Sequence, residues 1–179
     1  MKLLISQLIE GPNSFHFESQ RDSWMGEVAA RVGKAGHKVL SPLVADLSLT
    51  KLEPDYYLRG QMSFEVEQSC ARCAEAFTLP IQHSFDVALA HVEHGRVKSV
   101  EIAGESEELD VNFFDGNEIE LGPIVEEQFF LSLPYQAVCK DSCKGICQQC
   151  GKNLNVEPCA CATGQKLSPF SILHEYKLS

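Results

Sequence analysis

The residues best suited to chemistry in this sequence are eight cysteines, which occur as four close pairs. The pairs are Cys70-x2-Cys73, Cys139-x3-Cys143, Cys147-x2-Cys150 and Cys159-x-Cys161. A tetrahedral zinc ion takes four soft ligands, with sulfur at about 2.3 Å, and a C-x2-C turn offers two thiolates to one ion. Two pairs therefore complete one coordination shell, and the eight cysteines predict two zinc ions.

The spacing does not fix which pairs share an ion. Our preferred grouping joins Cys70 and Cys73 to Cys139 and Cys143, so that one ion ties two distant parts of the chain together. The second site would then be compact and local, formed by Cys147, Cys150, Cys159 and Cys161. The alternative is a single zinc ion with the remaining thiols free. A site closed by four cysteines leaves no position for water or substrate, so the pattern indicates a structural role and not an enzyme.

Turn-forming residues surround the later cysteines. Gly145, Gly151, Asn153 and Asn155 tolerate the left-handed backbone of tight turns. Such turns aim backbone N–H groups at sulfur and so stabilise thiolates.

The rest of the composition bears on compartment and membrane contact. Residues 1–7 carry one positive charge and only a short apolar stretch, which is too short for a signal-peptide core of about 7–15 residues and lacks a cleavage site. No apolar run approaches the roughly 18 residues of a membrane span. We therefore expect a cytoplasmic protein without a membrane partner, in which reduced cysteine pairs indicate metal rather than disulfides.

Charge is distributed unevenly along the chain. The first 133 residues carry 10 Lys and Arg against 22 Asp and Glu, whereas the remainder carries 5 against 3. An acidic body disfavours phosphate binding and suits a basic protein partner. The lysines of the cysteine-rich segment either offset thiolate charge or contact RNA; the candidates are Lys140, Lys144, Lys152 and Lys166.

Alternating patterns predict the strands that position the first cysteine pair. Apolar residues recur at every second position over 56–66 and again over 79–89, on either side of the short polar loop that holds Cys70 and Cys73. Two such runs predict an antiparallel hairpin. A third run, at 43–49, is expected in the same sheet, and shorter strands are expected near Lys2–Leu8 and Phe15–Phe17.

Helices are expected at three places. The first covers Asp22–Val32, with Ser23 as its cap and Gly33 as its stop. The second starts at Leu121 and ends before Pro134, with Leu131 among the residues packed on the sheet, and the third follows Ser168-Pro169. Residues 95–118 are expected to form a loop. These elements predict an α+β fold with a mostly antiparallel sheet, a body at 1–134 and a zinc-ribbon-like segment at 135–179.

Several motifs together resemble one known family. Glu126–Pro134 reads Glu-Glu-Gln-Phe-Phe-Leu-Ser-Leu-Pro and is followed by the cysteine pairs of residues 139–161. With Cys70-Ala-Arg-Cys73 between two strands, this pattern resembles the YceD family of large ribosomal RNA subunit accumulation proteins, a domain of unknown function. The resemblance covers nearly the whole chain and is most specific over 126–161. Some family members lack the Cys147–Cys161 set, which implies that the two cysteine sets are separate units.

No catalytic residues can be carried over from this resemblance, and we expect no small-molecule substrate. The resemblance implies a factor needed for accumulation of large-subunit (23S) ribosomal RNA and ribosome biogenesis, acting on a ribosomal protein or an immature large subunit. Two alternatives remain open. A directly RNA-binding zinc-ribbon module would lose affinity steeply with salt. A thiol-based redox or zinc sensor would release its metal on mild oxidation.

Overall fold

The computed structural model describes residues 1–52, 55–93, 96–97 and 110–161. The N-terminal elements are β1 (Lys2–Leu4), a 3-10 helix (Ile5–Gln7), β2 (Pro12–Glu18), α1 (Ser23–Lys34), β3 (Lys38–Val39), β4 (Val44–Leu52) and β5 (Asp55–Ser69). The later elements are β6 (Ala76–Glu93), β7 (Arg96–Val97), β8 (Asp110–Asp115), β9 (Glu118–Glu120) and α2 (Leu121–Ser132).

One large sheet forms the body. Its strands lie in the order β2-β4-β5-β6-β7, with β3 paired to β5 and β8 paired to β6. The β6–β8 pair is parallel and the other pairs are antiparallel. A separate two-stranded sheet joins β1 to β9. The predicted α+β class with a mostly antiparallel sheet is confirmed.

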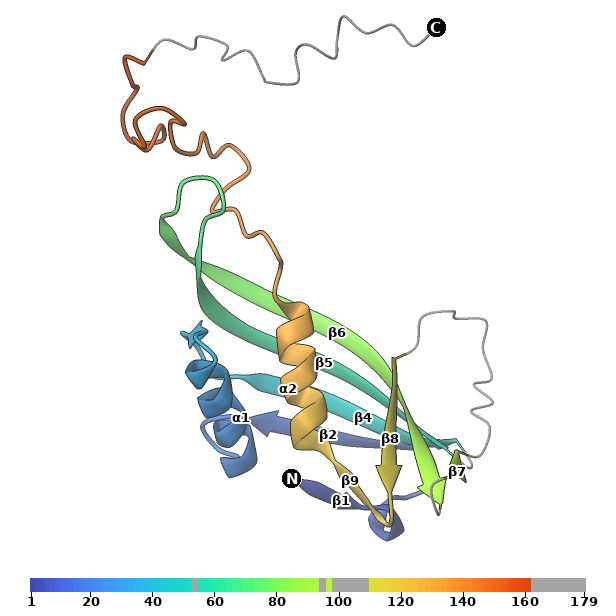
Figure 1. Cartoon of the computed structure of the whole chain (residues 1–179). Helices are drawn as coiled ribbons and strands as arrows, with labels where there is room; N and C mark the ends of the chain where they lie inside the picture. Colours follow the sequence, from blue (N-terminus) through green and yellow to red (C-terminus); the bar gives the residue numbers. More distant parts are fainter. Residues whose placement is uncertain (53–54, 94–95, 98–109, 162–179) are drawn as a thin grey trace, which may run out of the picture.

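Both helices cover the same face of this sheet (Figure 1). The alternation in β5 turns Leu58, Met62 and Phe64 into the core, as the sequence predicts. Phe129 of α2 stacks on the Phe64 ring, with 4.5 Å between centroids. Opposite Gly60, the Phe85 ring occupies the space that a side chain at Gly60 would need. This core fixes the lower part of the hairpin against the helices.

The hairpin formed by β5 and β6 reaches well beyond the body. The strands pair from Tyr56↔Leu89 to Ser69↔Ala76, so each contributes 14 paired residues. At about 3.3 Å per residue, this ribbon is on the order of 45 Å long. Figure 1 shows the hairpin carrying its tip, and the chain from Ala137 to Cys161 with it, away from α1 and α2. The cysteines are therefore held at one end of an elongated molecule.

The helix ends differ from the predicted ones. Asp22, not Ser23, is the residue that precedes α1, and its carboxylate accepts a hydrogen bond from the N–H of Glu18 instead of capping the helix. The helix runs through Gly33, because a glycine inside a helix costs only about 1 kcal/mol. The left-handed glycine lies three residues later, at Gly36, with φ 96°. In α2 the bounds are as predicted, but Leu131 faces solvent.

The expected loop at 95–118 is wrong in part. Residues 96–97 form β7, and the last residues of the range form β8 and the start of β9; these strands are too short and irregular to show a clear alternation in the sequence. The turn at Asp115-Gly116-Asn117 is present, and Gly116 has a positive φ of 75°. The strand near Lys2 is only three residues long and pairs with β9. The short helix predicted after Ser168 lies outside the described residues. No helix in the described part of the chain is long and apolar enough to cross a membrane.

Candidate metal centres

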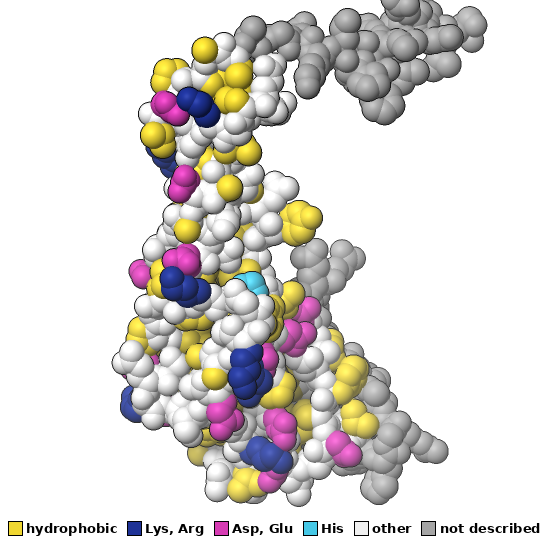
Figure 2. All heavy atoms as spheres, turned by 60° about the vertical axis from the view of Figure 1, so that its left-hand side comes forward, with side chains coloured by type: hydrophobic (Ala, Val, Ile, Leu, Met, Phe, Trp, Pro, Cys, Tyr) yellow, Lys and Arg dark blue, Asp and Glu magenta, His cyan; other side chains and the backbone are white. Residues whose placement is uncertain are grey.

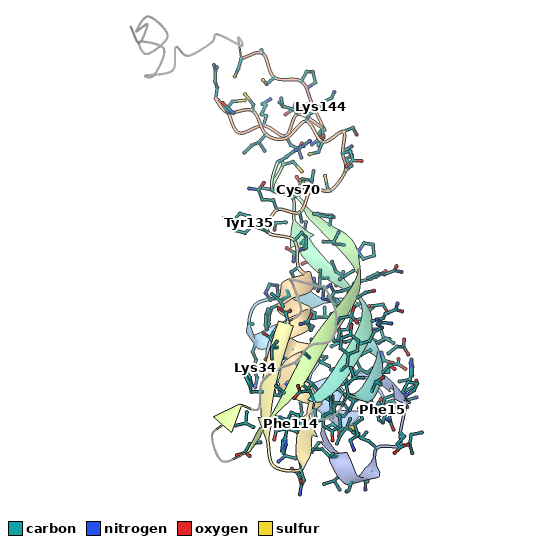
Figure 3. All side chains as sticks on the ribbon, turned by 90° about the vertical axis from the view of Figure 1, so that its right-hand side faces the viewer. Phe15, Lys34, Cys70, Phe114, Tyr135 and Lys144 are labelled. Atoms are coloured by element: carbon teal, nitrogen blue, oxygen red, sulfur yellow. The ribbon has the colours of Figure 1, made fainter. Side chains whose placement is uncertain are left out.

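Four cysteines from two distant segments meet at the hairpin tip. The turn between β5 and β6 supplies Cys70 and Cys73, and the chain after α2 supplies Cys139 and Cys143; Figure 3 marks Cys70 at the end of the hairpin. The four Sγ atoms lie within 4.8 Å of one another. Two of the separations, Cys70 to Cys143 and Cys73 to Cys139, are both 3.8 Å. A tetrahedron with metal–sulfur distances of about 2.3 Å has sulfur–sulfur edges of about 3.8 Å, so the spacing fits a bound metal.

The other four cysteines form a second cluster nearby in the chain. The Sγ atoms of this cluster also lie within 4.8 Å of one another, and they belong to Cys147, Cys150, Cys159 and Cys161. This cluster is more open than the first, because Cys150 is exposed whereas Cys70, Cys73 and Cys143 are buried. The grouping of the eight cysteines into these two sets is the one that the sequence analysis favoured.

The thiols of each cluster have very different proton affinities. The backbone N–H of Cys139 donates to Sγ of Cys70 at 3.4 Å and lowers the pKa of that thiol to about 6. Burial and the neighbouring Cys70 raise the pKa of Cys139 to about 12. In the second cluster, backbone N–H groups of Cys150 and Gln149 lower the pKa of Cys147 to about 6, whereas the thiol of Cys150 raises the pKa of Cys161 to about 12. Four thiolates this close repel one another, so a divalent cation is needed to hold them all in the charged form.

The two C-x2-C turns have the same backbone geometry. In the first, the N–H of Cys70 donates to Glu75 O and the N–H of Ala74 donates to Cys70 O, both at 2.9 Å. In the second, the N–H of Cys147 donates to Lys152 O at 2.8 Å and the N–H of Gly151 donates to Cys147 O at 2.9 Å. The residue after the second cysteine is left-handed in both, with φ 61° at Ala74 and 73° at Gly151. Each turn thus presents two sulfurs to one side.

Backbone contacts bind the cysteine-rich segment to the hairpin tip. The N–H of Ala71 donates to Ala137 O at 2.8 Å, and the N–H of Ile146 donates to Arg72 O at 3.0 Å. The Arg72 guanidinium donates to the carbonyl oxygens of Asp141 and Cys143. A side chain at Gly145 would approach Arg72 O to 3.0 Å, so the close contact favours glycine there. Arg72 could not be identified from the sequence, because nothing in its local pattern distinguishes it from an ordinary exposed charge.

Two asparagines support the first cluster through their side chains. Asn155 Nδ2 donates to Cys143 Sγ at 3.3 Å, and its Oδ1 accepts the N–H of Lys144 at 2.8 Å. Asn153 Nδ2 donates to Glu75 Oε1 on the hairpin tip at 3.3 Å. Neither asparagine has the left-handed backbone that its residue type tolerates, because among the described non-glycine residues only Ala74 has a positive φ. A donor to a ligand sulfur orients it and stabilises its charge.

The lysines proposed for RNA contact lie around the clusters. Lys140, Lys144 and Lys152 are exposed, and Figure 3 marks Lys144 in the segment above the hairpin. Lys152 pairs with Glu157 at 3.1 Å. Lys166 lies outside the described residues.

Two histidines lie in the body and belong to neither cysteine cluster. His91 Nε2 is 2.8 Å from Gly116 O in the body. His83 Nε2 is 3.0 Å from Oε1 of the buried Gln128, so it links β6 to α2. Neither histidine belongs to a group of three or more metal-ligating residues in the described part of the chain.

Comparison with known proteins connects this arrangement to a family. The family model described as "Large ribosomal RNA subunit accumulation protein YceD" matches residues 58–177, a span that includes most of the long hairpin, α2 and both cysteine clusters. No solved structure matches.

Curated relatives are distant and longer than this chain. An uncharacterized protein of Mycobacterium leprae is 25% identical over 118 residues, which cover 66% of this chain and 52% of the relative. The chloroplastic YCED homolog 1 of Zea mays is 24% identical over 170 residues, which cover 82% of this chain and 58% of the relative. The chain thus spans little more than half the length of these relatives. Because the family model covers most of the sequence, the chain belongs to the YceD family of large ribosomal RNA subunit accumulation proteins.

Proposed function

We propose that this chain is a non-enzymatic factor that binds two zinc ions and supports accumulation of large-subunit ribosomal RNA by binding a ribosomal protein or a pre-ribosomal particle. The observation that carries the metal part is the pair of four-sulfur clusters, each with its sulfurs within 4.8 Å of one another, and the first with two sulfur–sulfur separations of 3.8 Å. The ribosomal part rests on family membership and on the name of the maize relative. All-sulfur tetrahedral sites favour zinc among the abundant divalent ions. They need reduced thiols, which agrees with a cytoplasmic location.

Electrostatics favour a protein partner over direct RNA contact. The tip, taken as residues 70–75 and 137–161, contains four Lys and Arg against three Asp and Glu. Each zinc ion with four thiolates carries a charge of −2, so two filled sites give the tip a net charge of −3. The body is acidic as well. A molecule with this charge repels phosphate and attracts the basic proteins that assemble on ribosomal RNA.

The ribosomal role is tested by mild affinity purification of the tagged protein at constant zinc concentration, with and without ribonuclease. We expect large-subunit proteins or large-subunit RNA precursor to be recovered, and the protein part to persist after ribonuclease. Loss of every protein after ribonuclease, with binding that weakens steeply as salt rises, would support the RNA-binding alternative. Metal release under mild oxidation would support the thiol sensor. Absence of any ribosomal component would contradict the ribosomal proposal while leaving the zinc sites untouched.

The matching turns give a paired prediction for the zinc affinities. Ala74 has a left-handed backbone, which costs a residue with a side chain roughly 1–2 kcal/mol. Glycine removes this cost, but it also gives the unfolded chain more conformational entropy to lose on folding, which offsets part of the gain. We expect Ala74→Gly to tighten the first site by about 0.5–1 kcal/mol, or about two- to fivefold. Gly151→Ala should weaken the second site by a similar factor. Competition with a chromophoric chelator measures both, and tighter binding by Gly151→Ala would contradict the argument.

A further inference from the structure

A groove lies at the other end of the molecule from the cysteine clusters. It is bounded by the edge of β8, by β9 and by the first turns of α2, and it encloses about 390 Å³. Figure 3 marks Phe114, a residue of its β8 wall, near the lower end of that strand. A volume of this size holds a few side chains of a bound peptide.

The lining combines an apolar floor with an acidic rim. Leu89, Ile119 and Ile124 form the floor and are buried. Four carboxylates stand around it: Asp115, Glu118, Glu120 and Glu127. In Figure 2 the acidic and apolar side chains of the body are likewise intermixed on the face it draws.

One ammonium group already lies among these carboxylates. Lys2 Nζ is 2.9 Å from Glu118 Oε2 and 3.1 Å from Glu120 Oε1. The two carboxylates raise the pKa of Lys2, chiefly through the hydrogen bond to Glu118. Even with Lys2 counted, the rim keeps a net charge of −3. The carboxylates of the groove can therefore bind an ammonium group, and the remaining negative charge can attract further cationic side chains.

The wall of the groove is a strand edge. β8 pairs with β6 on one side, and among the described residues no strand pairs with its other side. Four consecutive residues of β8, from Asn112 to Asp115, line the groove along this edge. An unpaired strand edge presents backbone N–H and C=O groups that an extended peptide can pair with.

We propose that this groove binds an extended segment of a partner protein, rich in lysine or arginine, as an added strand along β8. Its alternate residues would place apolar side chains over Leu89 and Ile124 and cationic ones against Glu120 and Glu127. The carboxylates disfavour RNA at the same place, because they repel phosphate. The identification of the partner as a ribosomal protein rests on the proposed function. The chemistry by which the groove recognises a basic peptide does not depend on that function.

The test uses the full chain with zinc bound and a fluorescein-labelled nonapeptide of alternating lysine and valine. We expect Glu120→Lys combined with Glu127→Lys to weaken binding at least tenfold. The matched control combines Glu27→Lys with Glu65→Lys, which makes the same change in net charge at exposed positions away from the groove, and should bind within about twofold of the unchanged protein. Thermal unfolding of both variants checks that they are folded.

Further probes separate the proposed mode of binding from its rivals. A peptide with glutamate in place of lysine, and one with N-methyl groups at alternate residues, should both lose binding, because the first reverses the charge and the second removes the strand hydrogen bonds. Equal weakening by the two double variants, or full binding of the N-methylated peptide, would overturn the proposal. Tighter binding of oligouridylate than of the lysine peptide would also overturn it. So would a homodimer of the chain that the peptide cannot dissociate. Since no ribosomal component takes part, failure here is distinct from failure of the affinity purification.

Discussion

Removing zinc with a strong chelator is expected to unfold residues 137–161 while the sheet and both helices stay folded. The tip has few apolar contacts of its own: its buried cluster consists of Cys70, Cys73 and Cys143, with the half-buried Phe77 and Val138 packed against it. Its regular structure within residues 133–161 is a single β-bridge, between Ile146 and Asn153. Zinc in structural sites contributes apparent free energies of about 10 kcal/mol or more, so we expect most of the stability of the tip to depend on the metal.

The body has its own source of stability. Its core joins buried residues from β4, β5, β6, α1 and α2, and includes no cysteine. Hydrogen exchange measured before and after chelation should show protection lost over 137–161 and kept in the paired part of β4 and β5. Adding zinc back should restore protection, whereas magnesium, which prefers oxygen ligands, should not. Persistent protection of 137–161 after verified removal of the metal would contradict this prediction.

Replacing single ligands should show that the two clusters bind metal independently. Cys70→Ser removes one of the four thiolates at the hairpin tip, and it weakens the acceptor for the N–H groups of Arg72 and Cys139. We expect the first metal to be lost and the second to remain. The second site should survive because its four ligands lie within residues 147–161 and its turn is closed by local hydrogen bonds.

Cys147→Ser should have the complementary effect. It should empty the second site and leave the first filled, with new protease cleavage confined to residues 147–161. Native mass spectrometry counts the metal ions in each variant. Ser142→Ala, at an exposed position between two ligands, is the matched control and should keep both ions. Loss of both metals from Cys147→Ser, or of neither from Cys70→Ser, would show that the grouping is wrong.

The local part of the fold could be predicted from the sequence. The two-residue alternation around residues 56–66 and 79–89 predicted β5, β6 and their pairing, because a strand repeats its environment every second residue. Leu121 and Pro134 likewise bounded α2, since proline cannot continue a helix. β8 was not predicted because it pairs in parallel with β6. A parallel strand is not joined to its partner by a tight hairpin turn, and β8 shows no clear alternation, so the sequence lacks both signals of a strand.

The cysteine types and spacings by themselves determined that this protein offers thiolate pairs for metal ions, because a C-x2-C turn is a local structure. Which pairs come together was decided by tertiary structure. Cys70 and Cys143 are 73 residues apart in sequence, and they meet because the length of the hairpin and the path after α2 bring both to one point. The side-chain support from Asn155 and the acidic groove beside β8 arise in the same way. Backbone periodicity acts over a few residues, whereas a binding site depends on distances through space that only the packed chain defines.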